Sequence, residues 1–358
     1  MLPINKLLQA VIDLKGSDLH LAVGRPPTIR HHGKLRSLDL PVLTPDDTAA
    51  IMKAITPDRC QVELNDMKTT DFGFAFGKLA RFRVSVFMQK QVLGIALRII
   101  PNEILTFEQI GLPPSIKNLL LRPRGLFLVT GPTGCGKTTT LATMIDFINN
   151  EVPEHIITLE DPIEYYHEHR KSIITQREVG VDVPDFGEGL RRALRQDPDV
   201  ILVGEMRDLD TIESAIRAAE TGHLVFGTLH TTGAAKTIDR IIGAFPTNQQ
   251  EQIRMQLATS ILAVISQTLM PRADGKGRVA AFEIMISKPA IAHLIRKNET
   301  FKLGSIIETG EREGMVTLDS HLFQLYMGGD ISFNEMMKNA ANAEELEKKV
   351  KIVAGSKK

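Results

Sequence analysis

The residues from Gly131 to Thr138 have the types and the spacing of a loop that binds phosphate. They read GPTGCGKT, which matches the pattern G-x-x-x-x-G-K-[ST] without a deviation. Glycines let successive backbone N–H groups curl toward an anion, and the N-terminus of a following helix adds a positive dipole. Lys137 is then expected to reach the β- and γ-phosphates of a nucleotide, and Thr138 to bind Mg²⁺. The nucleotide-binding residues expected here are Gly131, Pro132, Thr133, Gly134, Cys135, Gly136, Lys137, Thr138 and Thr139.

Carboxylates follow two further apolar runs, each of which has the pattern of a buried strand. The run DVILVGE ends in Glu205, a position that suits a carboxylate holding the water shell of Mg²⁺ opposite the loop. The run ITLEDPIE presents Glu160, Asp161 and Glu164 together, and such carboxylates can orient the attacking water and complete a cation shell. Asp161 followed by a proline could instead be a helix cap. The clustering of the carboxylates favours the catalytic interpretation.

Two histidines, His223 and His230, flank the strand-like run Leu224–Leu229. From the residues alone, His230 could be an ordinary structural histidine or a group that contacts the γ-phosphate, and the two alternatives stay open. A second pair, His167 and His169, could bind a transition metal. Its very polar surroundings favour a surface loop instead.

Several arginines could stabilise the charge on a transferring phosphoryl group. Arg81 and Arg83 fall on one face of a predicted strand, and Arg98 lies on the next strand. The pattern alone favours a solvated strand face. The same question arises for three arginines on a predicted helix: Arg191, Arg192 and Arg195.

The elements that must position these residues fall into two regions. Residues 1–100 are typical of a small α+β unit, since 81–87 alternates apolar and polar residues with the period of a half-buried strand. Residues 101–115 are rich in proline and are expected to be a linker. From 116 to 358 the pattern becomes strand–loop–helix alternation, which indicates a parallel sheet buried on both faces. Helices are expected over 187–196, 210–221, 233–242 and 247–270, followed by a strand over 280–286 and C-terminal helices.

The composition excludes several classes of protein. The 43 basic and 43 acidic residues cancel, so no global field points to nucleic acid or to anionic lipid. Cys60 and Cys135 are too few for a disulfide framework or a tetracysteine zinc site, and a reducing cytoplasm fits. No signal peptide is expected, and no apolar stretch approaches the roughly 18 residues of a membrane span. Any work at a membrane is therefore expected to go through a partner.

Taken together, these motifs closely resemble the PilT family, the retraction ATPases of type IV pili within the larger group of secretion-motor ATPases. The resemblance covers about residues 1–340. The segments that carry it are GSDLHL at 16–21, the phosphate loop, TLEDPIEY at 158–165, LRQDPDVILVGEMRD at 194–208 and GHLVFGTLHTT at 222–232.

The resemblance implies an α/β fold and a role for each candidate residue. A RecA-like P-loop NTPase core over 116–358 would be joined to a smaller α+β, PAS-like N-terminal domain over 1–100. Glu164 becomes the expected catalytic base, Glu205 the Mg²⁺-water carboxylate and His230 a γ-phosphate contact. The resemblance also reverses the interpretation of the arginines as a solvated face. Arg83 and Arg98 match a pair that closes over nucleotide with Arg81 as a neighbour, while Arg191 and Arg195 match basic positions near a subunit boundary. Glu160, Asp161 and His223 are counted with the nucleotide-binding residues.

The function implied is that of an ATP- and Mg²⁺-dependent homohexameric motor. Domain closure would act on an inner-membrane platform protein and power pilus retraction and twitching motility from the cytoplasmic side of the pilus machine. A second retraction ATPase is a further candidate partner. Pilus extension and type II secretion are the alternatives, but those motors usually carry extra N-terminal sequence and a zinc-binding cysteine insertion. The retraction helix motif AIRNLIRE reads AIAHLIRK at 290–297, with Lys297 in place of a glutamate.

Two alternatives come from other classes of protein. A nucleic-acid translocase is disfavoured by the balanced charge and by the lack of an aromatic and basic stacking surface, so no nucleic acid is expected. A nucleotide-binding scaffold without activity is disfavoured by the intact Lys137, Glu164 and Glu205.

Overall fold

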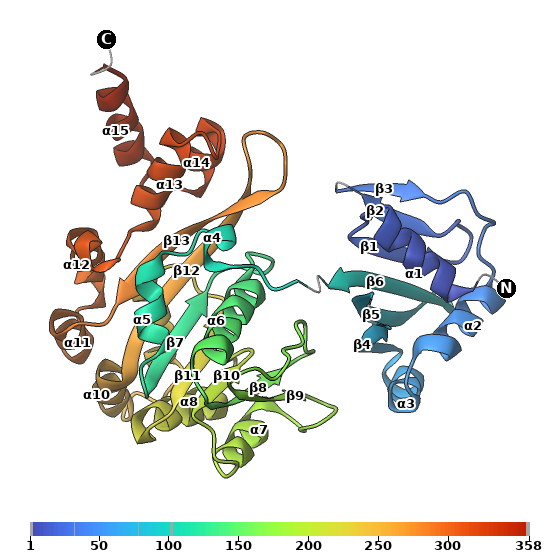
Figure 1. The fold of residues 1–358 in the computed structure, drawn as a ribbon, viewed down its shortest axis with the longest axis horizontal. Helices are drawn as coiled ribbons and strands as arrows, with labels where there is room; N and C mark the ends of the chain where they lie inside the picture. The colour runs from blue at the N-terminus through green and yellow to red at the C-terminus, as the bar shows by residue number, and fades with distance from the viewer. Residues whose placement is uncertain (1–2, 32, 78, 101–102, 356–358) are drawn as a thin grey trace. The chain divides into compact units, whose positions relative to one another are not determined.

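A computed structural model describes residues 3–31, 33–77, 79–100 and 103–355. The chain forms two units, each with its own sheet and its own hydrophobic core (Figure 1). The first unit comprises the N-terminal residues through Glu103 together with Pro162–Tyr166. The second comprises Ile104–Asp161 and the residues from His167 onward.

The first unit is built on a six-stranded sheet in the order β3-β2-β1-β6-β5-β4, whose paired strands are all antiparallel. The alternation predicted for β5 is confirmed, because Phe82, Val84 and Val86 are fully buried while Arg83 is exposed. The strands are β1 (Asp18–Ala22), β2 (Thr28–His31), β3 (Lys34–Ser37), β4 (Thr69–Phe76), β5 (Ala80–Gln89) and β6 (Val92–Ile100). The helices are α1 (Ile4–Asp13), α2 (Pro45–Ile55) and α3 (Asp58–Met67).

The second unit is built on a seven-stranded sheet in the order β13-β12-β7-β11-β10-β8-β9. All of its pairs are parallel except β12 with β13. Every residue of β7, β10 and β11 is buried, as expected of strands covered on both faces. The strands are β7 (Gly125–Thr130), β8 (His155–Glu160), β9 (Ile173–Glu178), β10 (Val200–Val203), β11 (Leu224–Leu229), β12 (Ile261–Pro271) and β13 (Arg278–Ile286). The predicted α/β fold, a RecA-like core with a smaller α+β N-terminal domain, is confirmed.

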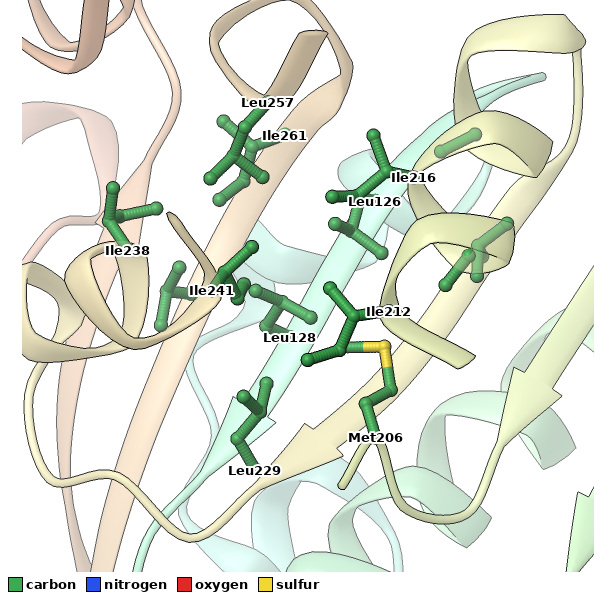
Figure 2. Close-up of a cluster of buried hydrophobic side chains, with 14 of the residues drawn as sticks. Leu126, Leu128, Met206, Ile212, Ile216, Leu229, Ile238, Ile241, Leu257 and Ile261 are labelled. Carbon is green, nitrogen blue, oxygen red and sulfur yellow. The ribbon is translucent and has the colours of Figure 1, made fainter. Parts of the chain in front are cut away.

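Helices cover both faces of this sheet and supply two separate cores. Figure 2 shows part of one core, in which β7 contributes Leu126 and Leu128, and α8 and α9 contribute Ile212, Ile216, Ile238 and Ile241. The α-helices before the last strand are α4 (Phe107–Ile110), α5 (Lys117–Leu120), α6 (Lys137–Glu151), α7 (Phe186–Ala193), α8 (Leu209–Thr221), α9 (Ala234–Gly243) and α10 (Gln250–Ser260). Those that follow are α11 (Pro289–Arg296), α12 (Leu303–Thr309), α13 (Leu318–Met327), α14 (Phe333–Asn339) and α15 (Ala343–Gly355). Short 3₁₀ turns lie at Pro114–Ile116, Thr300–Lys302 and Glu311–Glu313.

Most of the segment expected to be a linker is folded onto the second unit. Phe107 and Leu112 are buried in one of its two cores. Residues 101 and 102 lie outside the described residues. Among the helices that the structure describes, none is long and apolar enough to cross a bilayer.

The helix predicted over 247–270 is wrong in its second half. The helix α10 ends at Ser260, and β12 begins at Ile261 between β7 and β13. A short, continuously apolar run fits a buried helix and a buried strand equally well by periodicity, and here the pairing with two neighbouring strands decides. Strand β9, at the far edge of the same sheet, has no counterpart among the expected elements.

Candidate nucleotide-binding site

The phosphate loop joins the end of β7 to the start of α6, as its motif requires. Its first glycine, Gly131, has φ +140°, and a Cβ atom there would lie 2.3 Å from the backbone oxygen of Gln267 and 2.7 Å from Sγ of Cys135. Lys137, the first residue of α6, donates from Nζ to the backbone oxygens of Gly131 at 2.9 Å and Pro132 at 3.1 Å. The ammonium group is thus held over the loop whose N–H groups would bind phosphate.

The loop is fastened to the sheet by Gln267 of β12, which was not among the predicted site residues. Its Nε2 donates to the backbone oxygen of Cys135 at 2.6 Å, and its Oε1 accepts from Oγ1 of Thr140 at 2.8 Å. The side chain is almost completely buried. Gln267 therefore attaches both the phosphate loop and the first turn of α6 to β12, the strand beside β7. The signal in the sequence is an amide inside a mostly apolar run.

Replacing Gln267 with leucine should loosen the loop without changing its sequence. The carbonyl of Cys135 and the hydroxyl of Thr140 would each lose a buried partner, and each such loss costs about 1–3 kcal/mol. We expect the free energy of unfolding to fall by about 2–4 kcal/mol and the affinity for ADP to weaken with it. Urea unfolding and ADP titration would measure both effects, and unchanged values in both would contradict this role of Gln267.

Four neighbouring parallel strands, β7, β11, β10 and β8, end at the same edge of the sheet and bring the predicted residues to it. Oε1 of Glu205, two residues after β10, lies 2.7 Å from Nε2 of His230, which follows β11. Nδ1 of His230 lies 3.5 Å from Oγ1 of Thr133 in the phosphate loop. Residues predicted from three separate motifs thus meet in one place.

Arg207 is a further member of this group that was not predicted as a site residue. Its Nε lies 2.5 Å from Oε1 of Glu205, and the charge of Asp161 also acts on it, so the pKa of Arg207 is raised. Burial alone would raise the pKa of Glu205, but Arg207 and then His230 outweigh it and hold that pKa below its ordinary value. Glu205 is therefore ionised at neutral pH. Arg207 follows Glu205 by two residues in the EMRD run, which is the signal that could have pointed to it.

Glu160, the last residue of β8, is buried. Its Oε1 accepts from Oγ1 of Thr158 at 2.7 Å and from Nε2 of Gln176 at 3.2 Å. These contacts hold the end of β8 to β9. Such contacts are expected of a carboxylate that stabilises the strand ends next to the site.

Glu164 belongs to the segment Pro162–Tyr166, which lies with the first unit. Within this unit the guanidinium of Arg81 lies over the ring of Tyr166, 3.6 Å from its centroid. Such a cation–π contact stabilises by about 0.5–2 kcal/mol. Arg81 thus contacts Tyr166, which lies two residues after Glu164 in the chain.

Arg83 and Arg98 lie directly opposite each other across the antiparallel pair of β5 and β6. Like charges in this position destabilise a sheet unless an anion lies between them. Arg98 is paired with Asp18 of β1 through an Nε–Oδ1 contact of 2.8 Å. Burial would raise the pKa of Asp18, but hydrogen bonds from Ser17 and Arg98 lower it overall. Both arginines are exposed, and Arg98 has Asp18 as an acidic partner.

Three other predicted residues lie outside this group. His223 precedes β11 and its backbone oxygen accepts from the N–H of Gly125, the first residue of β7, so the length of both strands separates it from the phosphate loop. Arg191 of α7 is paired with Glu188 through an Nη2–Oε2 contact of 2.9 Å, and both Arg191 and Arg195 are exposed. His223 thus lies too far from this chain's own phosphate loop to contact a nucleotide bound there.

The pair His167 and His169 is only partly the surface loop that its polar surroundings predicted. His169 is exposed, and its Nδ1 accepts from the N–H of Ile174 at 3.1 Å. The imidazole of His167 is largely buried, and burial lowers its pKa to about 4. Among the residues that the structure describes, no group of three or more histidine, cysteine or acidic side chains could hold a metal ion.

Because the neutral form of His167 is favoured in the folded protein, stability should depend on pH through this residue. The pKa of His167 is about 4 in the folded protein and near 6.5 in the unfolded chain. Its contribution to the free energy of unfolding is therefore fully present above pH 6.5 and is lost as the pH falls toward 4. Between pH 7 and pH 5, the loss should be about 2 kcal/mol. Urea unfolding of wild type and His167→Phe would test this, with the exposed His293→Gln as control. An equal pH dependence in all three proteins would contradict the assignment.

The sheet, the phosphate loop and the polar groups at the strand ends define a nucleotide-binding P-loop ATPase with a RecA-like core. The sequence matches the model of the family described as "Type II/IV secretion system protein" over residues 4–338. The chain belongs to this family.

Individual relatives agree with the family assignment. The "Type IV pilus retractation ATPase PilT" of Pseudomonas aeruginosa is 50% identical over 329 residues, which is 92% of this chain and 95% of the relative. A "Twitching motility protein" of Neisseria gonorrhoeae is 45% identical over 320 residues, 89% of this chain and 86% of the relative. A crystal structure of the pilus retraction motor PilT with bound ADP superposes with a TM-score of 0.91 at 46% identity, covering 97% of this chain and all of that one.

Proposed function

We propose that this chain is an ATP-driven motor that powers the retraction of type IV pili. The observation that carries the proposal is the meeting of Thr133, Glu205 and His230 beside the phosphate loop, in a chain that aligns with a retraction ATPase over nearly its whole length. Relatives named for pilus assembly or type II secretion are less similar. The assembly ATPase PilB of Acinetobacter baylyi, for example, is 35% identical and is matched over only 47% of its length. Extension or secretion is therefore the weaker alternative.

Within this proposal each residue of the site has a separate task. Lys137 and the loop N–H groups bind the phosphates, and His230 contacts the γ-phosphate from the end of β11. Glu164 accepts a proton from the attacking water. Arg83 and Arg98 supply the positive charge that offsets the charge developing on the transferred phosphoryl group.

A magnesium ion fits the residues at the strand edge. The hydroxyl of Thr138 and the carboxylate of Glu205 are the hard oxygen ligands that Mg²⁺ takes, the latter through water. The ion pair that keeps Glu205 ionised supports this assignment. When bound, the ion would neutralise charge on the β- and γ-phosphates.

We further propose that six copies form a ring, in which closure of the N-terminal domain (1–100) on the ATPase domain (116–358) drives a platform protein of the inner membrane. In this proposal the motor acts from the cytoplasmic side of the pilus machine. The P. aeruginosa ATPase PilU is 38% identical over 97% of this chain, which supports a second, related ATPase as a candidate partner.

Deletion of the gene with complementation tests the direction of the motor. Cells that lack a retraction motor should be hyperpiliated and non-motile, and the wild-type gene should restore twitching. A Lys137→Ala gene should not restore it, because it lacks the phosphate-binding ammonium. Bald cells would instead indicate an extension motor. ATPase activity that DNA stimulates would support the nucleic-acid translocase, and the absence of phosphate release would support the inactive scaffold.

A further inference from the structure

The segment that follows His230 is fixed by two residues that face each other across β12 and β13. Ser266 and Glu283 are partners in the ladder of this antiparallel pair. Oγ of Ser266 accepts from the N–H of Gly233 at 2.8 Å, and Oε1 of Glu283 accepts from the N–H of Ala234 at 2.7 Å. Ala234 is the first residue of α9, so the turn between His230 and this helix is tied to the sheet by consecutive N–H groups.

Glu283 also reaches the C-terminal helices. Glu283 and Leu318, the first residue of α13, line the same groove, and the N–H of Leu318 lowers the pKa of the Glu283 carboxyl. The side chain thus caps the N-terminus of α9 and lies beside that of α13, and a helix dipole favours a negative charge at both places. Burial outweighs the N–H groups of Ala234 and Leu318 and raises the pKa of Glu283. The side chain therefore links the segment beside the phosphate loop to a helix far along the chain.

We propose that Glu283 is a positioning residue for ATP hydrolysis, which sets the place of His230 by fixing the start of α9 and couples that place to α13. This inference rests on the proposed contact between His230 and the γ-phosphate. The ring of His230 makes a long contact of 3.5 Å to Thr133 in the phosphate loop and a short one of 2.7 Å to Glu205. Glu205 holds the ring, while the short bonds of Ser266 and Glu283 fix the backbone on the C-terminal side of His230. Small displacements of a group that contacts the reacting atoms reduce turnover strongly.

The test is a Glu283→Gln variant, which keeps the shape of the side chain but removes its capacity for negative charge and weakens its hold on the N–H of Ala234. We expect kcat for ATP to fall about 10-fold while KM changes less than about 2-fold. The matched control is Glu308→Gln. Glu308 lines the same groove of about 350 Å³ as Glu283, but it is exposed. The control should leave kcat and KM unchanged.

A double-mutant cycle with His230→Ala separates positioning from general structural support. If Glu283 acts through His230, Glu283→Gln should lower kcat by less than about 2-fold in the His230→Ala background. An undiminished loss of about 10-fold in that background would overturn the inference while leaving the proposed role of His230 intact. Unchanged turnover in His230→Ala alone would instead remove the role of His230, and the inference with it. Should Glu283→Gln fail to fold by circular dichroism, Ser266→Ala replaces it in the same cycle, with the same expected pattern.

Discussion

A Glu164→Gln variant should bind ATP as tightly as the wild type and hydrolyse it at least about 100-fold more slowly. Glutamine has the shape of glutamate, but its amide cannot take a proton from the attacking water. The phosphate loop and Lys137 are untouched by the substitution, so nucleotide binding should persist. The expected signature is therefore a loss in kcat alone.

Two measurements on the same preparation would show this signature. Phosphate release at saturating ATP gives kcat, and titration with a fluorescent ATP analogue gives affinity. The matched control is Glu168→Gln, because Glu168 lies four residues later in the chain and is exposed. Turnover within about 3-fold of wild type in Glu164→Gln would remove Glu164 as the catalytic base. Parallel losses of binding and turnover would point to a structural role instead.

The parts of the site that are local in sequence could be predicted from it. The phosphate loop needs only its own glycines, Lys137 and the flanking strand and helix, all of which the motif specifies. The meeting of Glu205 and His230 was also predictable, because the carboxyl ends of adjacent parallel strands lie at one edge of a sheet. The same rule explains why His223, at the other end of the same strand, lies away from the loop.

The parts that depend on long-range pairing could not be predicted. Gln267 acts on a loop more than a hundred residues earlier, and only the order of the strands brings β12 beside β7. The apolar run that contains it was expected to be helical, and in a helix Gln267 would not have pointed at the loop. Glu283 has the same origin, since its partners Ala234 and Leu318 belong to two different helices. Residues of this kind carry no local motif.

A Gly131→Ala variant should lose nucleotide binding by at least about 100-fold, and its melting temperature should fall by several degrees. The added Cβ would lie 2.3 Å from the backbone oxygen of Gln267 and 2.7 Å from Sγ of Cys135, at a φ of +140° that side chains rarely adopt. The loop must move away from β12 to relieve this overlap. That movement carries away the N–H groups that would hold the phosphates.

ADP titration and thermal unfolding by circular dichroism would measure the two effects. Gly243→Ala is the control, because a Cβ at Gly243 in α9 meets nothing within 4 Å. Its nucleotide affinity should be that of the wild type. Wild-type affinity in Gly131→Ala would contradict the close approach of the loop to β12.

A second substitution, at Gln267, shows which of its atoms limits the space for a Cβ at position 131. The nearest neighbour of the added Cβ is the backbone oxygen at position 267, which every residue type carries. The double variant Gly131→Ala/Gln267→Leu should therefore bind nucleotide no better than Gly131→Ala alone. Recovery of binding in the double variant would mean that the side chain of Gln267, rather than its backbone, limits the space at Gly131. In that case the hydrogen bonds from the Gln267 side chain to Cys135 and Thr140 would set the distance between the loop and β12. The backbone oxygen of residue 267 would then not be the reason that position 131 requires a glycine.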